Sequence, residues 1–213
     1  MPDSRTSAGR TPGSPTAGTR LALDLTLTIR HDGRGGVADD LDSPAGLTRW
    51  VRERPDLLAR VRAPAGWTAN GADLAAVRSL RDAARALFAR AVRPGDPSPA
   101  DAARLIPVET AIGLLNGAAA AVPAVPRLEW PRDGGPVAHD HPAGGSAADA
   151  LPAALARAVI GFLAGPGRAE LRACHAPRCV RYFVKEHPRQ EWCKPSCGNR
   201  ARVARHHERH RTP

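Results

Sequence analysis

The four cysteines of the chain lie within 24 residues near its C-terminus. They are Cys174, Cys179, Cys193 and Cys197, spaced C-x4-C-x13-C-x3-C, and no cysteine precedes them. Two close pairs joined by a loop supply the four thiolates of a tetrahedral zinc site. Such a site is closed, because four protein ligands leave no position for water or substrate. We therefore expect one structural Zn²⁺ that staples a small module, with no catalysis at the metal.

Other ligands and other thiol chemistry compete with this interpretation. A histidine could replace a cysteine as ligand, the candidates being His175, His187, His206 and His207. A redox-active dithiol is a second alternative, although no C-x2-C motif occurs in a βαβ context. The N-terminal residues contain no apolar run of a secretory signal, so the chain is expected to be cytoplasmic. In that reducing compartment, clustered cysteines are metal ligands more often than disulfides.

A strongly basic segment, GNRARVARHHERHR, follows the last cysteine. On a helix Arg202, Arg205 and Arg209 would share one face, with Arg200 and Arg211 beside it. Guanidinium groups bind phosphates bidentately and can reach guanine edges in a major groove. We therefore predict nucleic-acid contact through Arg200, Arg202, Arg205 and Arg209. The alternative is a solvated helix end.

The net charge of +10 is concentrated in the same region. Residues 171–213 contain eleven lysines and arginines against three glutamates, a formal charge of +8. Four thiolates around one divalent ion would lower this value to about +6. Such an uneven charge distribution favours contact with phosphates.

The region before the cysteines has mainly helical patterns. The segment LALDLTLTI, residues 21–29, alternates apolar and polar positions and predicts a half-buried strand. Ser43, followed by Pro44, is expected to cap a helix that runs through Trp50. Residues 70–92 show the strongest helical periodicity of the chain.

Three further elements complete this region. Ser98, before a proline, is expected to cap a helix that runs to about Ala120 and that Pro107 and Gly113 could interrupt or kink. A hairpin is expected around the turn PRDGG, with strands at residues 127–130 and 136–139. The last element is an amphipathic helix over 146–164, which ends at glycines 165 and 167. No stretch of about 18 apolar residues was found, so no membrane span is expected.

These patterns predict an α+β fold in three parts. Residues 1–19 are rich in Ser, Thr, Gly, Pro and Arg and are expected to form a disordered leader. Residues 20–165 form a mainly helical domain with a few short strands. Residues 168–213 form a small treble-clef-like finger with a basic C-terminal helix.

Within the finger, the expected order is knuckle, hairpin and helix. Pro177 favours a tight turn between the first two cysteines, and VRYFV has the composition of a strand. EHPRQ would turn the chain so that EW leads back to Cys193. Pro195 suits a first helical turn, which places Cys197 near a helix N-terminus, where the helix dipole favours a thiolate. Nearby arginines would balance the remaining negative charge.

The finger resembles the CGNR zinc finger, which is named for the tetrapeptide found here at residues 197–200. Upstream, the segments LALDLTLT, SPAGLTRWV, VRSLRDAARALF and LLNGAAAAVPAVPRLEW are similar to the ABATE-type domain that precedes this finger. The resemblance covers roughly residues 20–213. It implies a bacterial, cytoplasmic, stress-induced transcription regulator whose zinc-bound finger binds nucleic acid and whose ligands are the four cysteines.

The chain departs from the family pattern at two places. The EHPRQ loop is shorter than in many relatives, so contacts with DNA through that loop would differ here. Relatives often contain LDLVNT near the N-terminus, and Leu27 stands at the position of that asparagine. A small ligand bound by the asparagine would lose that contact in this chain.

Three functions compete at this point. The leading one is a DNA-binding transcription regulator whose helical domain senses a small-molecule effector or forms a homodimer. The second is an RNA-binding or ribosome-associated zinc ribbon, in which Tyr182, Phe183 and Trp192 would stack on unpaired bases. These aromatic residues could instead form the core of the finger. The third is a small-ligand sensor whose finger binds another protein.

An enzyme is not expected. The sequence contains no nucleophile elbow, phosphate-binding loop or HExxH motif. Four polar residues near the first predicted strand, Asp24, His31, Asp39 and Asp40, are interpreted as surface charges.

Overall fold

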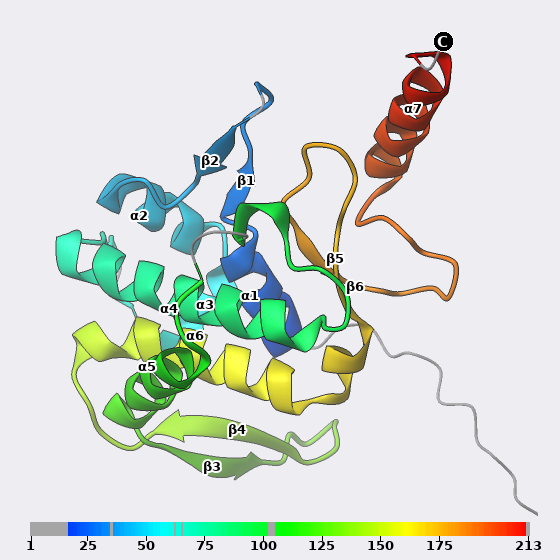
Figure 1. Cartoon of the computed structure of the whole chain (residues 1–213). Helices are drawn as coiled ribbons and strands as arrows, with labels where there is room; N and C mark the ends of the chain where they lie inside the picture. The colour runs from blue at the N-terminus through cyan, green and yellow to red at the C-terminus, as the bar shows by residue number, and fades with distance from the viewer. Residues whose placement is uncertain (1–16, 35, 62, 65, 102–104, 212–213) are drawn as a thin grey trace, which may run out of the picture.

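The computed structural model describes residues 17–211 except 35, 62, 65 and 102–104 (Figure 1). A helical region, α1 to α6, precedes two short strands and a C-terminal helix that projects away from it (Figure 1). The helices of the helical region are α1 (Ala17–Thr26), α2 (Pro44–Arg52), α3 (Pro55–Val61), α4 (Gly71–Ala91), α5 (Val108–Ala121) and α6 (Ala147–Ala164).

The segment predicted as a strand over 21–29 is a helix, so that prediction is wrong. In α1 the side chains of Leu21, Ala22 and Leu25 are buried at helical steps. Helix α1 packs against α6 and α4, and burial of its apolar face decides between helix and strand. Leucine and alanine are also good helix formers, which the alternating pattern concealed.

The predicted disordered leader lies mostly outside the described residues, which begin at residue 17. Residues 17–19, its last three, form the first turn of α1. The leader prediction therefore extends too far by one helical turn.

Two helix starts agree with the sequence. Ser43 caps α2, because its Oγ accepts a hydrogen bond from the Gly46 amide at 3.1 Å. Asn70 caps α4 and forms a reciprocal capping box with Asp73. In both cases a local side-chain bond satisfies an amide that the helix leaves free, so the pattern is visible in the sequence.

The helix predicted from Ser98 to about Ala120 is not continuous, and the break ends at Pro107, one of the residues expected to interrupt it. A 3-10 turn, η1, covers Pro99–Asp101, and α5 begins only after Pro107. Proline has no amide hydrogen and disfavours helical backbone in the residue before it, so α5 starts here instead of continuing an earlier helix.

Three antiparallel hairpins complete the described fold. They pair β1 (Ile29–His31) with β2 (Val37–Asp39), β3 (Ala124–Glu129) with β4 (Val137–Pro142), and β5 (Leu171–Ala173) with β6 (Tyr182–Val184). The predicted hairpin around PRDGG is confirmed as β3–β4, with Arg127 opposite His139.

Helix α6 is the central helix of the core. It packs against α1, α4 and α5, and its Phe162 ring lies 5.1 Å from the ring of Phe88 in α4. The helix is also long and apolar enough to pass as a membrane span, which the sequence analysis did not find. Its side chains at Leu155 and Val159 are buried among the other helices, as in the core helix of a globular fold.

The hairpin β5–β6 connects two cores. Leu171 and Tyr182 pack into the core of the helical region, whereas Phe183 packs among the cysteines. This division follows from the alternation of side chains along a strand. Cys174 and Cys179 lie in the loop between β5 and β6.

The strand partner within the finger therefore differs from the prediction. VRYFV does contain strand β6, but β6 pairs with β5, which precedes the first cysteine, and not with EW. After β6 the chain passes through a loop to α7 (Pro195–Arg211), the predicted basic helix.

Candidate metal centre and nucleic-acid interface

The structure brings the four cysteines together. Their sulfur atoms all lie within 4.8 Å of one another. Cys193 Sγ lies 3.7 Å from Cys179 Sγ and 3.5 Å from Cys197 Sγ. A tetrahedron with metal–sulfur bonds of about 2.3 Å places its sulfur atoms about 3.8 Å apart. The donor set and its spacing therefore fit a zinc ion, with no fifth position for a substrate.

The ionisation of the thiols shows why this cluster needs a cation. The hydrogen bonds from Cys179 and then from Cys193 lower the pKa of Cys174. The hydrogen bond to Cys174 raises the pKa of Cys179 and of Cys193, and burial raises both further. Without a cation these contacts favour a thiolate at Cys174 and disfavour ionisation of Cys179 and Cys193. A divalent ion removes this conflict, because it is bound by all four thiolates.

Nitrogen donors surround three of the four sulfur atoms. The backbone amides of Cys193 and Ala176 help to lower the pKa of Cys174, and the amide of Arg181 acts in the same direction on Cys179. At Cys197 the donor is a side chain, because the Arg200 guanidinium lies 3.1 Å from the sulfur.

Arg200 therefore faces the metal centre. Its Nε is buried and has no hydrogen-bond partner among the described residues. The predicted role of Arg200 as a nucleic-acid contact remains untested, but its guanidinium already balances charge at Cys197. This matches the expectation that an arginine near the cysteines would offset their negative charge.

The backbone at Gly198 lies close to the Trp192 ring, and this close approach favours a residue without a side chain. A Cβ atom at Gly198 would lie 3.0 Å from Trp192 Cδ1. Trp192 packs against the small core of cysteines together with Phe183. The glycine after the last cysteine thus leaves room for the indole ring that covers the centre.

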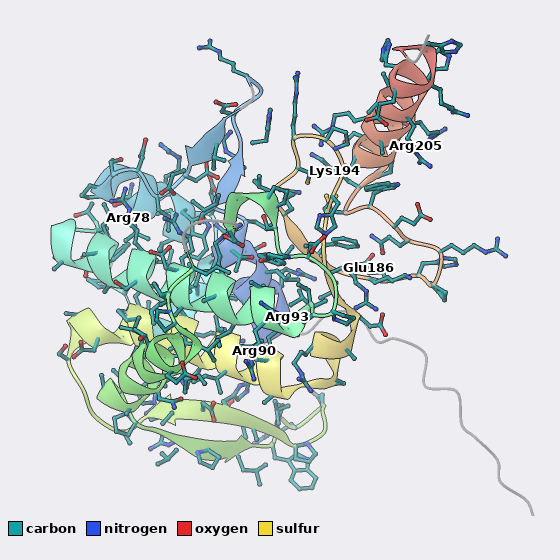
Figure 2. The ribbon with its side chains drawn as sticks, in the orientation of Figure 1. Arg78, Arg90, Arg93, Glu186, Lys194 and Arg205 are labelled. Atoms are coloured by element: carbon teal, nitrogen blue, oxygen red, sulfur yellow. The ribbon has the colours of Figure 1, made fainter. Side chains whose placement is uncertain are left out.

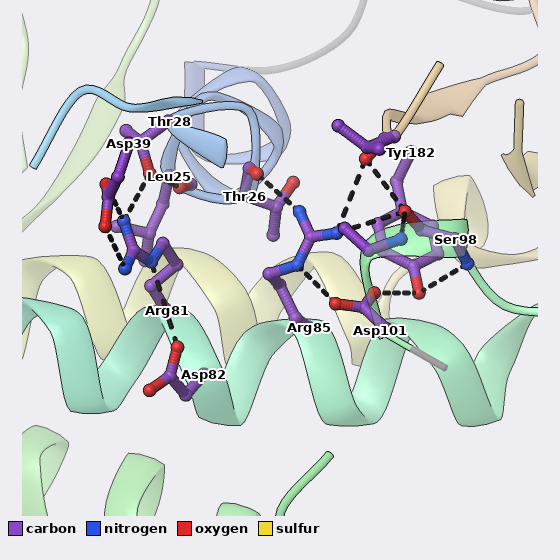
Figure 3. A network of polar contacts seen from close by, with 12 residues as sticks. Leu25, Thr26, Thr28, Asp39, Arg81, Asp82, Arg85, Ser98, Asp101 and Tyr182 are labelled. Carbon is purple, nitrogen blue, oxygen red and sulfur yellow. Dashed lines mark hydrogen bonds and ion pairs between the residues drawn. The ribbon is translucent and has the colours of Figure 1, made fainter. Parts of the chain in front are cut away.

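A buried polar network fastens the finger to the helical region (Figure 3). Arg85 of α4 forms an ion pair with Asp101 at 2.7 Å, and both side chains are almost fully buried. Tyr182 of β6 donates to the other oxygen of Asp101 at 2.6 Å. Ser98 Oγ donates to the Val180 carbonyl at 2.9 Å, and the Ser98 amide donates to the Tyr182 oxygen. We call Arg85, Ser98, Asp101, Val180 and Tyr182 the latch.

The latch satisfies nearly every polar group that it buries. Arg85 Nη1 donates to the Thr26 carbonyl at the end of α1, at 2.8 Å, and Nη2 donates to Ser98 and Val180. The Arg85 guanidinium also lies 5.4 Å from the centre of the Tyr182 ring. Val180 directly follows the candidate zinc ligand Cys179, so the latch begins one residue from the four-cysteine cluster.

A second buried arginine lies one turn earlier on α4. Arg81 binds both carboxylate oxygens of Asp39 and also donates to Thr28 (Figure 3). Burial raises the pKa of Asp39, but the bonds and charge of Arg81 outweigh it, so the net shift is downward. The interpretation of Asp39 as a surface charge is therefore wrong. Asp24 and Asp40 also form ion pairs, with Arg54 and Arg30.

The sequence analysis did not predict the latch, although the sequence of α4 contains a signal for it. Arg81 and Arg85 follow Val77 at steps of four, on the apolar stripe of α4 that ends in Phe88. A charged residue on such a stripe signals a buried ion pair when an acidic partner exists elsewhere. The partner, Asp101, could not be identified from its own short segment.

A cavity of about 800 Å³ adjoins the latch. Its walls include Arg85 and Asp101 of the latch, the Arg81–Asp39 ion pair, and apolar Leu105. This is a place where a small molecule could meet the residues that hold the finger.

The predicted arginine face of α7 is exposed. Arg202 donates to Asn199 Oδ1 at 2.8 Å, and Arg205 and Arg209 each bond to a carbonyl one turn earlier in the helix. Figure 2 shows the side chains of α7 standing clear of the helical region. Val203, the apolar residue among these basic ones, is 56% exposed.

The aromatic residues of the finger are packing residues. Tyr182 and Phe183 are buried, in the helical core and the cysteine core respectively. Trp192 is half-buried against the cysteines. Of the three aromatic residues proposed for base stacking, only Trp192 keeps an accessible surface.

Comparison with protein families gives two matches. Residues 19–166 match the ABATE family, described as “Putative stress-induced transcription regulator”, and residues 170–210 match the CGNR zinc finger. No curated protein matches the chain. The resemblance drawn from the sequence motifs is thereby confirmed. The four-cysteine cluster falls within the zinc-finger match and fits one zinc ion.

The first prediction concerns the latch and uses the single tyrosine of the chain. Burial, followed by the hydrogen bond and the charge of Asp101, raises the pKa of Tyr182. The latch therefore contributes its full stability below the ordinary tyrosine pKa of about 10 and loses it as the pH rises through the folded value. Phenolate absorbance should appear only well above pH ~10 and together with unfolding. If Tyr182 ionises in the native protein at the same pH as in a urea-denatured sample, the result would contradict the latch.

The second prediction compares two helical glycines. Gly198→Ala should destabilise the zinc-loaded protein by about 1–3 kcal/mol, because the new methyl group displaces Trp192. The matched control is Gly117→Ala in α5, where a Cβ meets no atom within 4 Å. That variant should be stabilised by about 0.5–1 kcal/mol, through reduced backbone entropy of the unfolded chain. Urea unfolding measures both, and equal stability of the two variants would refute the role of Gly198.

Proposed function

The chain belongs to the ABATE family and ends in a CGNR zinc finger, and on this premise we propose that it regulates transcription by binding duplex DNA through α7. The observation that carries the proposal is the geometry of the finger. A closed four-cysteine centre fixes the first turn of α7, and the rest of the helix extends into solvent with its arginines exposed.

The proposed DNA contacts are Arg202, Arg205 and Arg209. They lie at steps of three and four on α7, so they can follow one strand of phosphates or the edge of a groove. The only acidic residue of α7 is Glu208, and the helix ends in a cluster of histidines and arginines. A helix with this charge gains affinity by releasing counterions from DNA. Arg200 is a weaker candidate because it is engaged with Cys197.

Duplex DNA is favoured over unpaired RNA by the burial of the aromatic residues. Recognition of single strands depends on exposed aromatic rings that stack on bases. Tyr182 and Phe183 pack in the two cores, and Trp192 covers the cysteines. For an RNA-binding role, α7 would still supply positive charge, but most of the aromatic surface needed to stack on unpaired bases is buried.

A second candidate role, compatible with the first, is a small-molecule sensor. The cavity beside the latch supports it, because a ligand there would touch Arg85 and Asp101, which hold the finger. We propose a cytoplasmic binding protein of this kind and no enzymatic activity. Native mass spectrometry of the protein purified from its host tests the sensor role. A retained small molecule that is lost on Arg81→Met substitution supports it, and its retention in that variant would contradict the assignment of the cavity.

The third prediction tests the DNA interface. Each of Arg202→Ala, Arg205→Ala and Arg209→Ala should shallow the slope of log K against log salt by about one unit, because each removes about one phosphate contact. Fluorescence anisotropy with a labelled duplex, measured over a salt series, gives the slopes.

The matched control for this experiment is Arg127→Ala. Arg127 is an exposed arginine of β3, at the end of the molecule opposite α7 (Figure 1), so the same charge is removed away from the interface. Its slope should equal that of the parent. If the three α7 variants also keep the parent slope, α7 is not the DNA-binding surface.

A further inference from the structure

Solvent reaches the metal centre at one cysteine. Cys174 and Cys197 have no exposed surface and Cys179 is 5% exposed, whereas Cys193 is only half-buried. A small oxidant attacks a thiolate that it can approach, so oxidation of such a centre begins at the accessible sulfur. Of the four cysteines, Cys193 is the one whose surface is open to solvent, so we expect oxidation to begin there.

The side-chain contacts of Cys193 differ from those of Cys197. The Arg200 guanidinium lies 3.1 Å from the Cys197 sulfur. Among the described contacts, the Cys193 sulfur meets the sulfur atoms of Cys179 and Cys197. A thiolate that accepts N–H hydrogen bonds is a weaker nucleophile than one that does not. Cys193 is thus the most accessible cysteine of the centre, and the described contacts place a guanidinium at Cys197 but not at Cys193.

A resolving thiolate lies next to it. Cys197 Sγ is the nearer of the two sulfur atoms found next to Cys193 Sγ, at 3.5 Å against 3.7 Å for Cys179. Arg200 and the start of α7 balance the negative charge of a Cys197 thiolate. The Cys197 sulfur therefore lies within reach of an oxidised Cys193 sulfur and can form a disulfide with it.

We propose that Cys193 is an oxidation site at which hydrogen peroxide converts Cys193 and Cys197 into a disulfide that releases the metal. The Cys193 thiolate attacks one peroxide oxygen, an S–O bond forms and the O–O bond breaks, and the departing hydroxide is protonated to water. The Cys197 thiolate then attacks the sulfenic sulfur, an S–S bond forms and the S–O bond breaks, and a second hydroxide leaves and is protonated. The two thiolates together lose two electrons, which reduce one peroxide to two waters.

The disulfide removes two of four ligands and acts mainly on α7. Cys174 and Cys179 alone bind the ion too weakly to retain it, and the small cysteine core has few other contacts. Strands β5 and β6 stay in place because Leu171 and Tyr182 are packed in the helical core. Oxidation therefore releases α7 from its fixed position while the latch persists.

The test uses the zinc-loaded full-length chain and limiting hydrogen peroxide. Released zinc is measured with a chromogenic chelator, and disulfides are mapped by differential alkylation and mass spectrometry. We expect one zinc released per disulfide formed, with Cys193–Cys197 as the first disulfide. Any other first disulfide, or zinc release while all four thiols remain reduced, overturns the proposal.

A pair of ligand substitutions sharpens the test. Cys193→His and Cys174→His each keep four ligands of types that zinc accepts, but only the first removes the accessible sulfur. After zinc content is verified, Cys193→His should release zinc at least ~10-fold more slowly in peroxide than Cys174→His. Equal rates would overturn the assignment of Cys193. If either variant fails to load zinc, the disulfide map of the parent decides alone. Neither readout involves nucleic acid, so the outcome is independent of the proposed DNA binding.

Discussion

The buried ion pair between Arg85 and Asp101 determines how the two parts of the molecule fit together. Removing two charges from water costs several kcal/mol per ion, and the cost is offset only when each remaining donor and acceptor is satisfied. The helical region supplies part of this, through the Thr26 carbonyl and Ser98. The finger supplies the remaining hydrogen-bond partners, which are the Val180 carbonyl for Arg85 and the Tyr182 hydroxyl for Asp101. Without docking of β6, the Asp101 carboxylate would lack one of its donors.

This constraint links the metal to the fold. Along β6 successive side chains alternate, with Tyr182 in the latch and Phe183 among the cysteines. The candidate zinc ligand Cys179 lies three residues before Tyr182, the first residue of this strand, so the metal centre is held in a defined position on the helical region. Cys197 belongs to both the cysteine cluster and α7, so the position of the cluster also sets the position of α7. The arginine face of α7 therefore meets solvent in one orientation. A finger joined by a free linker would lack this coupling.

Features of this protein that depend on local chemistry were predictable from the sequence. The four-cysteine cluster, the cap at Ser43, the start of α4, the β3–β4 hairpin and the start of α7 each follow from nearby residues. The failures all depend on distant partners. The Leu-rich segment of α1 is compatible with a helix or a strand, and its packing against α6 selects the helix. The strand that pairs with β6 is β5, which precedes the first two cysteines. The latch joins residues up to 95 positions apart, and single-sequence patterns do not encode such pairing.

The most direct test of this account is hydrogen–deuterium exchange on the zinc-loaded chain with Arg85→Met, compared with Arg90→Met. Both arginines lie on α4, but Arg85 is buried in the latch whereas Arg90 is exposed. The account predicts that amides of residues 171–184 lose protection in Arg85→Met, while those of α6 stay protected and Arg90→Met behaves as the parent. Unchanged protection of residues 171–184 in Arg85→Met would contradict the claim that the buried ion pair holds the finger in place.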